Sequence, residues 1–229
     1  MKTRFRTILL SLFSLLAILL TCATARVEGV WPIGISFSPE HHVPEGVIGL
    51  ALGLPWGEYE AVAGIEASLA VNKTKHWMVG FQMTPGVNMA DQTLLAWQAA
   101  CIANYAEDAF GIQTAIAYNR INDSLSGMQF GAANFAGELK HGLQIGIFNR
   151  AGPPGAFDRV QNGIQFGVVN WSDNISGTQL GLWNRAPDIH GLQLGLVNTA
   201  TTLHGLQLGL LNFVSESTLP CLPLLRVSF

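Results

Sequence analysis

The stretch Gly205-Leu206-Gln207-Leu208-Gly209-Leu210-Leu211-Asn212 decides the fold, because it is one copy of a repeat. The pattern Gly-x-Gln-x-Gly-x-x-Asn recurs through the second half of the 229-residue chain. Its defining residues are Gly127, Gln129, Asn134, Gly142, Gln144, Asn149, Gly163, Gln165, Asn170, Gly177, Gln179, Asn184, Gly191, Gln193, Asn198, Gly205, Gln207 and Asn212. Self-similarity at a fixed period predicts an architecture built from stacked units.

Weaker copies of the pattern extend the repeat towards the N-terminus. They begin at Gly34, Gly49, Gly64, Gly80, Ala96 and Gly111, which gives about twelve units. Successive units start 14 to 16 residues apart, except where an insertion at 151–158, rich in Pro and Gly, predicts a surface loop. We therefore expect a single β-repeat domain over residues 26–229.

Each unit alternates apolar and small or polar residues with a period of two, which predicts strands. Leu206, Leu208 and Leu210 share one face of the strand, and Gln207 lies on the other. In a solenoid we expect the Leu face to point into the core and the Gln face to point outward. Residues 91–109 could form a helix by composition, but they keep the repeat spacing and are interpreted as strand.

The favoured fold class is an all-β parallel solenoid of 14–16-residue units. The connectors support it, since the second residue after Asn is small and an aliphatic residue precedes the next Gly. The small residues are Ala136, Ala151, Ser172, Ala186 and Ala200, and the aliphatic ones are Leu125, Leu139, Val160, Ile175, Ile189 and Leu203. Parallel stacking would place like residues about 4.8 Å apart, so that Gln and Asn amides could form ladders.

The alternative is an antiparallel outer-membrane β-barrel of about 12–14 strands. Charged residues of the clear repeats fall in the connectors, and strands of 9–10 residues are long enough to cross a membrane. The chain also ends in an alternating segment with a terminal aromatic, Phe229, similar to the C-terminal signal of such barrels. Against it, a barrel alternates short and long connections, whereas these connectors share one pattern.

The N-terminus predicts export. Lys2, Arg4 and Arg6 precede an apolar run over 8–20, and small residues at 23–25 fit a cleavage site, so residues 1–25 are interpreted as a signal peptide. Cys22 leaves a lipidated form open. Of 12 basic residues, removing these three leaves nine against 15 acidic ones, a net charge of −6. This balance argues against nucleic acid or an anionic membrane as partner.

The repeated Gly-Leu-Gln-Leu-Gly-Leu-x-Asn run, followed by Leu219-Pro220-Cys221-Leu222-Pro223-Leu224-Leu225, resembles a family of exported bacterial surface-repeat proteins seen in Leptospira, with similar sequences in Bacteroidetes. The resemblance covers essentially the whole mature chain. It implies location in the cell envelope and a repetitive β fold, and it carries over no activity and no functional residue. The N-terminal copies depart from the motif, because they lack its second Gly or its Gln.

Candidate sites are few. Three histidines, His141, His190 and His204, directly precede repeat glycines. No Cys or carboxylate in the repeat supplies the further ligands that a metal site needs, so we interpret these histidines, like His41-His42, as exposed turn residues. Glu66 replaces Gln within a strand and is expected on a solvated face. We predict no catalytic residue, cofactor or metal site. Cys101 and Cys221 could be bridged or free.

The residue before each Asn should point outward and form an apolar stripe, in which Phe148 and Trp183 are the expected interface anchors. The predicted function is that of an exported, non-enzymatic envelope or surface protein with a structural or adhesive role. Its partner would be the bacterial envelope or outer membrane, or another surface protein, with no nucleic acid and no identified small-molecule substrate. A barrel fold would instead imply a pore or transporter.

Overall fold

The computed structural model of the chain describes residues 29–37, 46–152 and 160–228. The expected signal peptide, Cys22, the pair His41-His42 and most of the insertion expected at 151–158 lie outside these residues. Within the described ranges, no helix has the length and hydropathy needed to span a bilayer.

The described chain folds into fifteen strands of one continuous sheet. They are β1 (Val30–Ser36), β2 (Gly46–Gly53), β3 (Trp56–Ser68), β4 (Val71–Thr84), β5 (Val87–Ala100), β6 (Ala103–Ala115), β7 (Tyr118–Phe130), β8 (Ala133–Ala151), β9 (Val160–Ser172), β10 (Asn174–Leu180), β11 (Trp183–Arg185), β12 (Asp188–Leu194), β13 (Val197–Ala200), β14 (Thr202–Val214) and β15 (Cys221–Ser228). Residues 91–109 fall in β5 and β6, so their interpretation as strand is confirmed.

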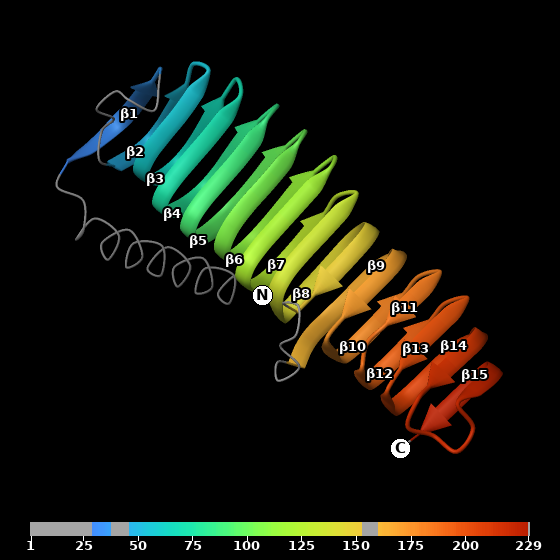
Figure 1. Cartoon of the computed structure of the whole chain (residues 1–229). Coiled ribbons are helices and arrows are strands. Elements are labelled where there is room, and N and C mark those ends of the chain that lie inside the picture. The colour runs from blue at the N-terminus through green and yellow to red at the C-terminus, as the bar shows by residue number, and fades with distance from the viewer. Residues whose placement is uncertain (1–28, 38–45, 153–159, 229) are drawn as a thin grey trace, which may run out of the picture.

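Neighbouring strands from β1 to β14 run parallel, which makes the molecule a β-solenoid of about 11 turns. Figure 1 shows the coils stacked in sequence order from β1 to β15. Repeat residues pair with their own kind: Gly177 lies opposite Gly191, and Gly191 opposite Gly205. The barrel alternative is wrong, because its neighbouring strands would have to run antiparallel. The C-terminal segment that suggested a barrel is β15, which runs antiparallel to β14 at the end of the stack.

Each coil is flattened and has two layers. In the coil of β12 and β13, the chain leaves the first layer at Leu194, turns through Gly195 and Leu196, and enters the second layer at Val197. Gln193 and Asn198 stand on either side of this corner, and both side chains are fully buried. We call the residues between each such Gln, or its equivalent, and the following Asn the apolar edge. They are 52–56, 67–71, 83–87, 99–103, 114–118, 130–133, 145–148, 166–169, 180–183, 194–197 and 208–211.

The expectation that the Leu face points inward is wrong. Leu208 and Leu210 are 48% and 59% exposed, whereas Gln207 and Asn212 are fully buried. The alternation between inward and outward side chains is interrupted at the corner formed by Gly209 and Leu210. Gln207 lies before this corner and Asn212 after it, and both side chains point inward. The Gln face therefore points inward in the first layer.

The apolar part of the core comes from the connectors, largely as expected. The small residues Ala136, Ala151, Ala186 and Ala200 and the aliphatic Leu125, Leu139, Ile175, Ile189 and Leu203 are all buried. Val160 is the exception, since it is about half exposed. Gln161 takes the inward place next to it, pairs with Ile175 in register and accepts a bond from the backbone N–H of Leu139.

Candidate functional site

Two ladders of side-chain amides run through the interior along the stack. Each repeat Gln from Gln82 to Gln207 donates from Nε2 to the side-chain oxygen of the equivalent residue in the preceding coil, at 2.7–2.9 Å. Each repeat Asn from Asn72 to Asn198 donates from Nδ2 to the Asn of the following coil, at 2.8–2.9 Å. The ladders predicted from the repeat therefore exist, and their amide dipoles run in opposite directions.

The same amides tie the two layers of each coil together. Gln98 also donates to the carbonyl of Tyr105 in the second layer, at 3.2 Å. Asn104 in turn donates to the carbonyl of Thr114 in the first layer of the next coil, at 2.8 Å. Because a buried amide without partners is costly, this pairing along the stack explains why Gln and Asn recur in the interior. At the ends of the ladders, Asn72 Oδ1 and Gln207 Oε1 are buried without a partner. The repeat-defining residues thus build the scaffold.

The Gln ladder ends on a carboxylate. Oε2 of Glu66 accepts from Gln82 Nε2 at 2.9 Å and from the hydroxyl of Thr74 at 2.6 Å, while Oε1 is buried without a partner. Glu66 is fully buried, so its expected place on a solvated face is wrong. Burial raises the pKa of Glu66 to about 7, against the bonds from Thr74 and Gln82, which lower it. In the sequence, Glu66 stands out because it occupies the position that is Gln in the later repeats.

The three histidines that precede repeat glycines lie on the surface. His141, His190 and His204 are exposed, as expected, and the rings of His190 and His204 stack with centroids 4.8 Å apart. Among the residues that the structure describes, no three His, Cys, Asp or Glu side chains are placed to hold a metal ion together. Cys101 and Cys221 are exposed free thiols, on the β5–β6 corner and on β15.

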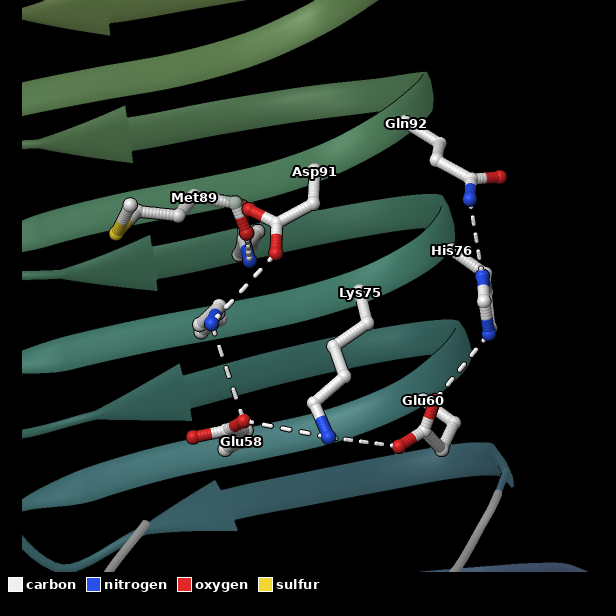
Figure 2. A network of polar contacts seen from close by, with 9 residues as sticks. Glu58, Glu60, Lys75, His76, Met89, Asp91 and Gln92 are labelled. Atoms are coloured by element: carbon white, nitrogen blue, oxygen red, sulfur yellow. Dashed lines mark hydrogen bonds and ion pairs between the residues drawn. The ribbon is translucent and has the colours of Figure 1, made fainter.

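Charged side chains gather at the corner opposite the apolar edge. We call this the charged edge; it comprises Glu60, Lys75, Asp91, Glu107, Asp108, Asp123, Glu138 and Lys140. Lys75 Nζ lies 2.8 Å from Glu60 and 3.4 Å from Glu58, and the bond to Glu60 raises the pKa of Lys75. Figure 2 shows how this network continues through His76 to Gln92 on the next coil.

The apolar edge is the most extended surface feature. In the described part of the chain, none of its residues is Asp, Glu, Lys or Arg. Large apolar side chains stand exposed at the corner itself, namely Leu54, Leu69, Ile102, Ile116, Ile147, Val168, Leu182, Leu196 and Leu210. The first layer adds a further row directly after the first residue of each unit, in which Ile65, Trp97, Met128 and Ile164 are exposed. The sequence predicted only part of this surface, the residue before each Asn, because a core position was expected for the leucines.

The expected anchors belong to this surface. Trp183 is 46% exposed, and Phe148 is half-buried against Phe135, with ring centroids 5.5 Å apart. Further along the second layer, the guanidinium groups of Arg150 and Arg185 lie 5.4 Å and 4.7 Å from the ring of Trp171. The side chains of Phe148 and Trp183 therefore point outward, and their role as interface anchors stays a prediction.

The arrangement defines a class, the parallel β-solenoids with interior amide ladders. Comparison of the chain with protein-family models, curated proteins and solved structures finds no match.

Proposed function

We propose that this protein is exported to a bacterial envelope, where it has a non-enzymatic structural or adhesive role, as a member of the surface-repeat family that its motif resembles. The apolar edge carries the proposal. An exposed apolar surface that continues along a whole molecule commonly marks a contact with a partner or a membrane. About 11 turns at about 4.8 Å per turn give this edge a length of about 50 Å.

The interior supports a scaffold role. The buried Gln and Asn side chains of the ladders bond to one another and to the backbone. These amide groups are therefore not available to a substrate. The basic, apolar and small-residue order over residues 1–25 supports export.

Cell fractionation tests the proposal. The full chain, expressed with a C-terminal tag in a Gram-negative host, should appear in the envelope fraction with a new N-terminus near residue 26. A chain lacking residues 2–25 is the control and should stay in the cytoplasm. Recovery of the full chain from the cytoplasm with its original N-terminus would overturn the proposal.

A further inference from the structure

We infer that the partner of the apolar edge is a lipid layer, and that the solenoid lies along a membrane surface with this edge inserted into one leaflet. The inference rests on the proposed envelope location and names what the chain contacts there. Three observations carry it: the shape of the apolar surface, its depth, and the residues at its borders.

The apolar surface turns around the corner of every coil. Leu194 faces outward from the first layer, Leu196 stands at the corner, and Val197 faces outward from the second layer. The same sequence of outward apolar residues repeats at Leu208, Leu210 and Leu211. A flat partner, such as the matching face of a second copy, would cover one layer and leave the other in water. Fluid acyl chains can cover both layers of such a corner.

The depth of the apolar surface fits one leaflet. Outward residues on a strand are about 6.6 Å apart, because each residue advances about 3.3 Å. In the first layer, two rows of uncharged outward residues lie between the corner and the row of His190 and His204. These two rows span about 13 Å along the strand. Half of a bilayer's hydrocarbon core is about 15 Å thick. The edge therefore reaches into one leaflet and does not cross to the other.

The borders of this surface carry residues typical of membrane interfaces. On the second layer, one row follows directly after each Asn or its equivalent, and most of its members are aromatic or charged. It contains Glu58, Lys73, Met89, Tyr105, Arg120, Phe135, Arg150, Trp171, Arg185, Thr199 and Phe213. Aromatic rings with a polar group favour the headgroup level, and Arg can keep its stem in apolar surroundings while its charge reaches the headgroups. The charged edge lies on the far side of each coil and would remain in water.

Flotation with vesicles of phosphatidylcholine tests the inference on purified chain 26–229. We expect the protein to float with the vesicles at both low and high salt, because apolar insertion does not depend on net charge. The variants Ile147→Glu and Leu182→Glu, at positions 60% and 53% exposed, should each lower the partition coefficient about tenfold or more. Combined, the two changes should abolish flotation.

Val160→Glu is the matched control, because Val160 is a similarly exposed aliphatic residue, 48%, at the first residue of β9 and away from the apolar edge. It should float like the unchanged chain, and circular dichroism should show that all variants are folded. Equal loss in Val160→Glu, or no flotation of the unchanged chain, would overturn the inference. A dimer in sedimentation that Leu182→Glu dissociates, without flotation, would assign the edge to a second copy instead. An envelope location without flotation would leave the proposed function standing alone.

Discussion

The coils around β4–β6 and those around β10–β14 turn the apolar edge with different numbers of residues. Asn104 follows Gln98 by six residues, whereas Asn198 follows Gln193 by five. In the longer corner Ala100 follows the outward Ala99, and in the shorter one Gly195 occupies the place directly after Leu194. The change falls between the corners that end at Asn119 and Asn134.

The two corners give the edge different surfaces. The longer corners hold Ala67, Met83, Ala99 and Thr114 at this outward place, and they line an open groove of 680 Å³ that ends near Phe130. The shorter corners present Phe166, Leu180, Leu194 and Leu208 at the equivalent place, and the edge is a ridge there. Both ladders pass this change without a break, so the amides hold the coils in register while the corner varies.

The largest expected effect follows from breaking the Asn ladder once in each region. Asn104→Leu would leave Asn88 Nδ2, Asn119 Oδ1 and the carbonyl of Thr114 without their partner. Asn184→Leu would do the same to Asn170, Asn198 and Leu194. Since each unsatisfied buried group costs about 1–3 kcal/mol, we expect either variant to lower the free energy of unfolding by about 4 kcal/mol.

Urea denaturation followed by circular dichroism measures this loss. Asn162→Leu is the control, because Asn162 is exposed, and it should stay within about 0.5 kcal/mol of the unchanged chain. A loss for Asn184→Leu less than half that for Asn104→Leu would show that the ladder does not support the two regions equally.

The repeat spacing was enough to predict parallel coils and amide ladders, because both follow from placing like residues one above another. The direction of the faces could not be read from a period of two. Gly209 and Leu210 form a corner, and a corner changes which positions point inward without interrupting the alternating pattern. A core position for the leucines leaves only the residue before each Asn exposed, so it predicts one part of the apolar edge and does not predict the burial of Glu66. The grouping of Glu58, Lys75 and Glu60 depends on how the coils stack.

The second prediction compares the two ends of the Gln ladder, Glu66 and Gln207. Glu66 has a pKa of about 7 in the folded chain, against 4.5 for the free side chain. The folded state therefore holds its proton more tightly, and the stabilisation it provides is complete below about pH 4.5. It is lost as the pH rises to about 7, by a total of about 3 kcal/mol.

Glu66→Gln should abolish this fall in stability between pH 5 and pH 8, as measured by urea midpoints at both values. The matched control is Glu216→Gln, an exposed carboxyl near the other end of the stack, which should keep the unchanged profile. An identical pH dependence in Glu66→Gln and the unchanged chain would show that another group causes it.

The smallest expected effect concerns the corners themselves. A methyl group on Gly195 would lie 2.5 Å from the carbonyl oxygen of Gly181 and 2.6 Å from Asn184 Nδ2, so neither the backbone nor the ladder can give way easily. Gly195→Ala should cost about 2 kcal/mol of unfolding free energy. Ala100→Ser in the longer corner should cost less than about 1 kcal/mol, because Ser68 and Thr84 already place hydroxyls in that row, 3.2 Å apart. Urea midpoints compare the two variants directly. Equal losses would mean that the shorter corner is no tighter than the longer one, and that the difference in corner length has no energetic consequence.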